Sequence, residues 1–226
     1  MRILALETTG KTGSVAAWSE GALVAERELP ATQRNAQSLA PAIRDLLAQA
    51  GWQPGEVELI AVAQGPGSFT GLRVGIVTAK TLAYATGAQV LGVNTLEAIA
   101  DAAPQEVVQL EVVMDAFREQ VFVGSFERAA QGDMAWRGET RIVDSQIWID
   151  ELSPSMPVSG PMLRKLASRL PSTTTALPDA CWEPRARDVA RIAERDYLRG
   201  RRDDLWGLVP QYYRASAAEE KLQSSA

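Results

Sequence analysis

The densest cluster of glycines in the chain lies at residues 65–75. It reads Gly65-Pro66-Gly67-Ser68-Phe69-Thr70-Gly71-Leu72-Arg73-Val74-Gly75. The cluster follows an apolar segment expected as a strand at 59–64 and leads into a helix expected at about 70–85. A loop between a strand and a helix directs backbone amides and the positive end of the helix dipole toward one point. This unit therefore predicts an α/β fold with a candidate anion site.

The candidate anion-site residues are Gly65, Gly67, Ser68 and Thr70. The same glycines also have a structural interpretation, because Gly65 and Gly67 permit a tight turn with positive φ. The segment is not a dinucleotide fingerprint, since Thr70 stands where the third glycine of that motif is needed. Spacing alone leaves both interpretations open.

The helix that follows the loop is apolar around most of its circumference. Such a helix lies either in the core or beneath a partner subunit, and glycines four residues apart suit a close helix–helix contact. The sequence leaves core and interface as alternatives. The candidate partner-interface residues are Gly71, Leu72, Val74, Gly75, Thr78 and Leu82.

The two halves of the chain repeat a similar order of strands and helices. In the first half, strands are expected at 2–7, 14–18, 23–29, 59–64 and 89–93, and helices at 40–50, 70–85 and 95–102. In the second half, strands are expected at 110–115, 121–126, 139–143, 157–159 and 173–177, and helices at 145–152, 162–170 and 187–199. Two related α/β lobes that face each other across a cleft explain this repetition. We expect the lobes at 1–103 and 104–226, with the tail from about residue 205 returning to the first lobe.

Composition excludes several kinds of chemistry. The chain of 226 residues has no histidine and one cysteine, Cys181, so imidazole bases, His-ligated metals and internal disulfides are all excluded. The net charge of −5 disfavours autonomous binding of nucleic acid. The first apolar run, residues 3–6, is too short for a signal peptide, so we expect a cytoplasmic protein with no membrane segment.

In each half of the chain, the first expected strand ends at a carboxylate residue. Glu7 and Asp115 would both face the cleft of a two-lobed fold, where carboxylates hold a Mg²⁺–nucleotide or act as a base. With Thr8 and Thr9 they form the candidate nucleotide cleft, although each is also an ordinary acid at a strand end. The Gly-Lys-Thr at 10–12 is not a P-loop, because Ala5 stands where that motif needs glycine.

Several blocks of the sequence resemble the bacterial TsaB family, in the family's order and over nearly the whole chain. They are residues 2–9, the loop at 65–75, residues 92–97, the Asp-Ala-Phe-Arg segment from Asp115, and Pro210-Gln211-Tyr212-Tyr213-Arg214. The resemblance implies the two-lobed actin/Hsp70-like (ASKHA) fold. It also implies a role in making threonylcarbamoyladenosine next to the tRNA anticodon, as a non-catalytic subunit.

The partner implied by the resemblance is TsaD, the transferase, paired through the N-terminal lobe as a heterodimer and joined by the ATPase TsaE. The chain would bind tRNA only as part of this complex. Alternatively, the same surface could pair two copies of the chain in a homodimer. No catalytic residue, metal or obligatory cofactor is implied for this chain, although ATP and Mg²⁺ could take part in the complex. TsaD holds its metal with His-x-x-x-His, and the matching positions here are Thr95 and Ile99, which cannot replace two imidazoles.

The chain departs from the family pattern at three places. Glu7 replaces a frequent aspartate, Asn35 replaces a frequent histidine, and Phe117 occupies the position of an arginine, with Arg118 one place later. The alternative hypothesis is an ATP-hydrolysing or phosphoryl-transfer enzyme of the same fold that uses Glu7 and Asp115 with Mg²⁺.

Overall fold

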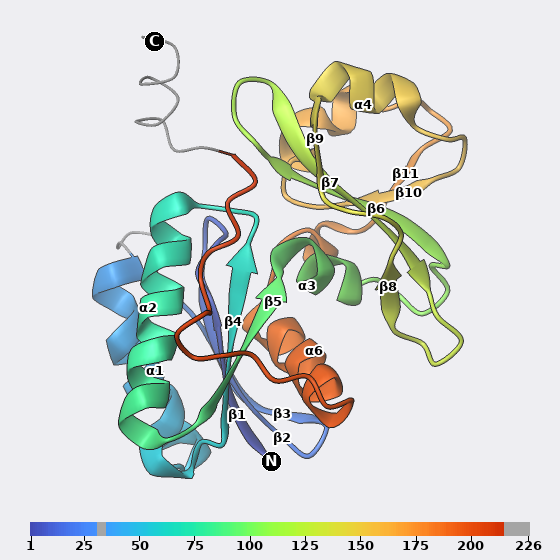
Figure 1. Cartoon of the computed structure of the whole chain (residues 1–226). Helices are drawn as coiled ribbons and strands as arrows, with labels where there is room; N and C mark the ends of the chain where they lie inside the picture. The colour runs from blue at the N-terminus through green and yellow to red at the C-terminus, as the bar shows by residue number, and fades with distance from the viewer. Residues whose placement is uncertain (31–34, 215–226) are drawn as a thin grey trace, which may run out of the picture.

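The computed structural model describes residues 1–30 and 35–214 as two lobes, each a mixed sheet with helices on both faces (Figure 1). The first sheet has the order β3-β2-β1-β4-β5. Its strands are β1 (Arg2–Glu7), β2 (Ser14–Ser19), β3 (Ala22–Glu28), β4 (Leu59–Gly65) and β5 (Gln89–Asn94). β1 pairs antiparallel with β2 and parallel with β4, so it is the central strand.

Both faces of the first sheet are buried, as the alternation along β1 requires. Leu4 and Leu6 pack with α1 (Asn35–Ala50) and α2 (Phe69–Thr86). Ile3 and Ala5 pack with α6 (Ala186–Leu198) on the opposite face. By the same alternation, Glu7 at the end of β1 lies on the α6 side.

The second sheet has the order β11-β10-β6-β7-β8, and β9 also pairs with β7. Its strands are β6 (Gln109–Asp115), β7 (Gln120–Arg128), β8 (Met134–Trp136), β9 (Arg141–Asp144), β10 (Pro157–Ser159) and β11 (Thr175–Ala176). One face packs against α3 (Thr95–Asp101), and the other against α4 (Ser145–Glu151) and α5 (Leu163–Leu166). Short 3₁₀ turns lie at Pro54–Glu56, Ala167–Arg169 and Asp179–Cys181.

The expected order of elements is confirmed, with local differences. α1 begins at Asn35 rather than near residue 40 and carries Pro41 inside it, on an exposed side of the helix. The helix expected at 162–170 divides into α5 and a 3₁₀ turn, which ends before the extended Leu170 because Pro171 disfavours a helical residue before it. β8 was not expected, since three residues show no measurable periodicity.

Some residues after the expected lobe boundary at residue 103 pack in the first lobe. α6 belongs by sequence to the second half, yet its apolar stripe, which includes Val189 and Ile192, packs on the first sheet. That face of the first sheet is apolar and needs a helix to bury it. Leu208 likewise lies in the same core cluster as α1 and α2. None of the helices in residues 1–30 and 35–214 is long and apolar enough to cross a membrane.

Candidate functional site

The glycines of the 65–75 segment are required by close contact with the chain's own backbone. A β-carbon at Gly71 would overlap the carbonyl oxygen of Thr8, and one at Gly75 would overlap the Thr8 hydroxyl. Gly67 has φ +152 and lies against Thr9, while Gly65 has φ +128 and lies against the backbone of Gln211. The loop is therefore fitted to the turn after β1, which supports the structural interpretation of its glycines.

The loop amides are partly committed to internal hydrogen bonds. Ser68 is the N-cap of α2 and accepts a hydrogen bond from Gly71 N at 3.2 Å, and its own amide donates to Thr9 O at 3.0 Å. Thr70 is exposed on the first turn of α2. These bonds fasten the loop to the turn and leave the candidate anion site with fewer amides than its sequence suggests.

Glu7 is completely buried at the end of β1. Its Oε1 accepts hydrogen bonds from Thr9 N at 2.6 Å, from the Thr9 hydroxyl and from Gly10 N at 3.1 Å. Its Oε2 is buried without a hydrogen-bond partner. Burial raises the pKa of the carboxyl from 4.5 to about 7; the bonds from Thr9 and Gly10 lower the pKa, and the charge of Glu183 raises it further.

Asp115 lies in a different environment at the end of β6. Its carboxylate forms an ion pair with Lys165 and accepts a hydrogen bond from Phe117 N at 2.8 Å. Within the described residues, no hydrogen bond or ion pair connects Asp115 with Glu7. The two carboxylates expected to share a cleft are thus engaged separately, one sealed in the first lobe and the other paired at the surface of the second.

The positions where the sequence departs from the family pattern, or from the metal ligands of the transferase, differ in their surroundings. The Asn35 amide donates to Thr8 O at 3.0 Å, so it helps to hold the turn after β1. Phe117 and Arg118 lie in the β6–β7 turn with φ of 62 and 51, and Phe117 is exposed. Thr95 and Ile99 are both completely buried on α3, where Ile99 is part of the core of the second lobe. In residues 1–30 and 35–214, no cluster of three or more histidine, cysteine, aspartate or glutamate side chains could hold a metal ion.

α2 turns its glycines inward and a different set of side chains outward. Gly71, Leu72 and Gly75 are buried against the first sheet, so these three predicted interface residues are not on the surface. Val74, Thr78 and Leu82 are half-buried. The outermost side chains are Val77 and Tyr84, which are 61% and 72% exposed. One face of this helix is therefore core, and the opposite face is exposed.

The segment of residues 205–213, which we call the strap, crosses α2 and β4 (Figure 1). Lys80 donates to Trp206 O at 3.0 Å and to Leu208 O at 3.1 Å, and Gln211 N donates to Gln64 O at 2.9 Å. The rings of Phe69 and Tyr212 stack 4.5 Å apart, and those of Tyr84 and Trp206 lie 5.8 Å apart. Beyond the strap, Arg214 donates to Ala116 O in the second lobe at 2.6 Å. The strap therefore adds an exposed indole, Trp206, beside the outer face of α2.

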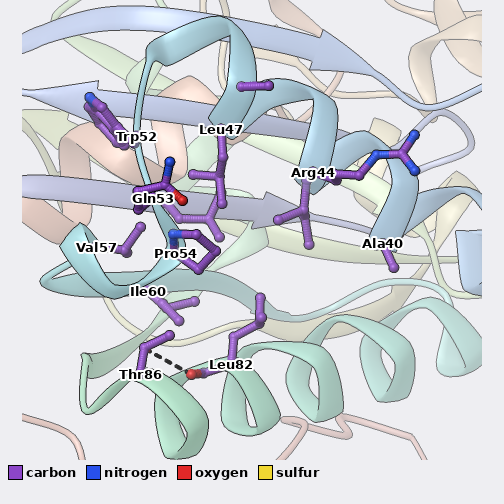
Figure 2. Close-up of a pocket in the computed structure, with 13 residues that line it drawn as sticks. Ala40, Arg44, Leu47, Trp52, Gln53, Pro54, Val57, Ile60, Leu82 and Thr86 are labelled. Carbon is purple, nitrogen blue, oxygen red and sulfur yellow. Dashed lines mark hydrogen bonds between the residues drawn. The ribbon is translucent and has the colours of Figure 1, made fainter.

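An apolar pocket of about 400 Å³ opens between α1 and α2 (Figure 2). Its walls are mainly aliphatic and aromatic, with Arg44, Gln53 and Thr86 as polar members. Leu82 and Thr86 line it from α2, so the pocket borders the helix that carries Val77 and Tyr84. The full lining is Leu4, Ala40, Ile43, Arg44, Leu47, Ala48, Trp52, Gln53, Pro54, Val57, Ile60, Leu82 and Thr86. Sequence periodicity did not indicate this pocket, because it depends on the spacing between two helices.

An ion-pair network joins α3 to α6. Arg195 pairs with Glu97 at 2.7 Å and Arg191 with Asp101 at 2.6 Å. Arg191 also reaches Asp188, whose Oδ2 is buried without a partner. Burial raises the pKa of Asp188 from 3.8 to about 7, against the opposing effect of Arg191.

Two mixed sheets, each covered by helices, define a protein of the two-lobed actin/Hsp70-like class. A solved structure titled as the activator of the 2-hydroxyisocaproyl-CoA dehydratase from Clostridium difficile with bound ADPNP shares the fold. Its TM-score is 0.50 at 9% identity, over 90% of this chain and 99% of that chain. A family model described as "TsaD: tRNA N6-adenosine threonylcarbamoyltransferase" matches residues 29–140.

Relatives at higher identity are more specific. The tRNA threonylcarbamoyladenosine biosynthesis protein TsaB of Escherichia coli is 33% identical over 62% of this chain. The protein of the same name in Bacillus subtilis is 32% identical over 56% of this chain. A solved structure titled "YeaZ from Pseudomonas aeruginosa" has a TM-score of 0.80 at 28% identity, over 93% of this chain and 99% of that one. The chain is therefore similar to bacterial TsaB proteins, as its motifs indicate. Its matches span 60% and 56% of the lengths of the Escherichia coli and Bacillus subtilis relatives.

Proposed function

We propose that this chain acts in the biosynthesis of threonylcarbamoyladenosine in tRNA, as a cytoplasmic, non-catalytic subunit that pairs with a threonylcarbamoyltransferase of the TsaD type. The names of its relatives support the pathway. In this proposal TsaE joins the pair, tRNA is bound only by the assembled complex, and a homodimer competes for the same surface. In this proposal the chain needs no metal or cofactor of its own; the buried Thr95 and Ile99 supply no imidazole ligands at the positions that match the metal ligands of the transferase.

The observation that carries the pairing is the outward face of α2 together with the strap, which we call the α2 face and define as Val74, Val77, Thr78, Thr81, Tyr84 and Trp206. Its three most exposed members are Val77, Tyr84 and Trp206, each more than 60% exposed. Contiguous exposed apolar and aromatic side chains are typical of protein–protein interfaces, where tyrosine and tryptophan contribute much of the binding energy. The α2 face replaces Gly71, Leu72 and Gly75 as the surface offered to the partner.

The pocket between α1 and α2 supports the same proposal. It borders the α2 face through Leu82 and has room for one large apolar side chain. Interfaces commonly seat an aromatic or aliphatic anchor of one partner in a pocket of the other. An apolar anchor of the transferase in this pocket would extend the contact from α2 to α1.

The candidate nucleotide cleft supports a non-catalytic role. Glu7 is sealed from solvent and three hydrogen bonds occupy its Oε1, while Asp115 is paired with Lys165. A Mg²⁺–nucleotide site needs carboxylate oxygens that solvent and substrate can reach. Glu7 does not meet that requirement without rearrangement, and Asp115 would first have to release Lys165.

The experiment is co-purification with the transferase encoded in the same genome, followed by size-exclusion chromatography and a Kd measurement. Val77→Asp and Tyr84→Asp should each weaken pairing by at least about tenfold, because each places a charge in a desolvated interface. Leu198→Asp is the matched control, since Leu198 is 76% exposed on α6, outside the α2 face, and the change should leave Kd within about twofold.

Two results would contradict the pairing and the non-catalytic role, and a third would contradict the pathway. One is a complex whose Kd is unchanged by both variants of the α2 face. The other is robust ATP turnover by the purified chain alone that Glu7→Ala or Asp115→Ala abolishes, which would favour the enzyme hypothesis. Reconstituted threonylcarbamoylation that proceeds at the full rate without this chain would remove its place in the pathway.

A further inference from the structure

The two oxygens of the Glu7 carboxyl have opposite surroundings. Oε1 accepts three hydrogen bonds from the turn after β1, whereas Oε2 has none and no exposed surface. A buried carboxylate oxygen without a partner loses its hydration and receives nothing in return. The arrangement suits a neutral carboxylic acid, with Oε1 as the acceptor and the proton on Oε2.

A second carboxyl approaches Oε2 from the chain segment that leads into α6. A β-carbon built at Gly10 would lie 3.5 Å from Glu7 Oε2 and 3.7 Å from Glu183 Oε2. The same point is 3.4 Å from the ring of Pro184, so residues 183 and 184 pack directly on the turn at 8–13. The two carboxyls therefore lie on the same side of Gly10, where the first sheet contacts the segment before α6.

The other charges around this contact do not neutralise the pair. Arg164 of α5 binds Glu183 through the opposite oxygen, Oε1, at 3.2 Å. Arg185, next along the segment, pairs with Glu28 of β3 at 3.7 Å. Lys11 in the turn is exposed. Glu183 acts on Glu7 as a like charge and raises its pKa, with a smaller effect than burial and than the hydrogen bonds from Thr9 and Gly10.

The ligand that fits this place is a proton rather than a metal ion. A bound metal needs space beside the oxygen for its other ligands, and Oε2 has no surface that even a water molecule could touch. A proton needs no such space. It removes the like-charge repulsion with Glu183.

We propose that Glu7 and Glu183 form a proton-operated latch between the turn at 8–13 and the segment at 182–185. With Glu7 protonated, the turn and the segment stay packed together. When Glu7 loses its proton, a buried negative charge faces Glu183, and the contact opens to let water reach Oε2. The latch is independent of pairing with a transferase, and its test requires no partner.

The test is hydrogen exchange of the full chain between pH 6 and pH 8, with rates corrected for the chemical effect of pH. In the wild-type chain, the opening constant of peptides covering 8–13 and 182–185 should rise about tenfold over this range. That factor follows from a carboxyl that titrates near 7 when closed and near 4.5 when open. Peptides from β7 should show no such rise.

Three variants make the test decisive. Glu7→Gln keeps the acceptor and replaces the proton by a permanent donor, so its opening constant should be flat with pH. Glu183→Gln removes the facing charge, so the rise should persist with its midpoint at lower pH. Glu139→Gln, an exposed glutamate before β9, is the control and should match the wild type.

Asp188→Asn separates the latch from the other buried acid that titrates near pH 7, and it should retain the tenfold rise. A wild-type rise that Glu7→Gln also shows would overturn the latch, as would a flat wild-type profile. If Glu7→Gln does not fold, an unmoved midpoint in Glu183→Gln would overturn it equally.

Discussion

Gly71 of α2 lies directly against the carbonyl oxygen of Thr8, so closely that residue 71 has no room for a β-carbon. One helical turn later, Gly75 lies against the hydroxyl of the same threonine. The Thr8 hydroxyl in turn donates to Gly71 O at 2.8 Å. The two glycines thus set the distance between α2 and the turn after β1, which is a property of the fold rather than of a partner surface.

Gly71→Ala should destabilise the free chain. The new methyl group overlaps a backbone atom that cannot rotate away, so α2 must shift, at a cost of about 2–3 kcal/mol or more. Urea unfolding of the purified chain measures this, with Gly55→Ala as the control, because a β-carbon at Gly55 meets nothing within 4 Å. Unchanged stability in Gly71→Ala together with loss of pairing would return this glycine to the partner interface.

Leu208→Ala should release the strap. Leu208 is 3% exposed within the core of the first lobe, and truncating such a leucine costs about 2–5 kcal/mol. Limited proteolysis should then cut within 205–213 much faster than in the wild type, and pairing should weaken because Trp206 leaves the α2 face. Val209→Ala is the matched control, because Val209 is adjacent and 56% exposed. Equal cleavage of both variants would show that Leu208 does not anchor the strap.

Much of the fold follows from local pattern. β1 alternates between two buried faces, and the 65–75 segment is bounded by clear strand and helix signals, so the elements of the first lobe were predictable. α6 was predictable as a helix but not in its position. Its apolar stripe could pack on either sheet, and which sheet it joins depends on which apolar sheet face is not already buried by other helices.

The candidate site was less accessible to sequence reasoning. Glu7 and Asp115 occupy equivalent places in the two halves, but packing seals Glu7 from solvent, and Asp115 is paired with Lys165, a residue far away in the chain. The glycines of α2 correctly predicted that another part of the protein packs closely on this helix. They did not show that this part is the turn after β1 rather than a partner subunit. The strap had one signal, the block at 210–214 that resembles the family's C-terminal ending, and the pocket between α1 and α2 had none.

Filling that pocket should weaken pairing with the transferase. Ala48 is exposed at its α1 rim, so the indole of Ala48→Trp can fold over the opening and exclude an apolar anchor. We expect Kd to rise by about tenfold or more, as for the loss of an interface hot spot, with little change in the stability of the free chain. Gln49→Trp is the control, because Gln49 is exposed on α1 and does not line the pocket. Equal affinities for the two variants would exclude the pocket from the interface.

The stability of the chain should fall as the pH rises from 5 to 8, and Asp188 should account for a defined part of the fall. Its folded pKa of about 7 lies above its ordinary value of 3.8, because burial disfavours the charged form. The folded state therefore holds a proton that the unfolded state has already lost, and the stabilisation present at low pH disappears as the pH passes 7. The contribution lost between pH 5 and 8 is roughly 2–3 kcal/mol.

Asp188→Asn removes this titration while keeping a carbonyl oxygen for Arg191, so the variant should lose less stability than the wild type over the same range. The comparison is urea unfolding of both proteins at pH 5 and pH 8, which cancels the contributions of Glu7 and the other acids. Asp45→Asn, at a half-exposed residue on α1, serves as the control and should leave the pH dependence as in the wild type. A fall in Asp188→Asn as steep as in the wild type would mean that the Asp188–Arg191 contact keeps the carboxylate ionised, and that Asp188 carries no proton in the folded state at neutral pH.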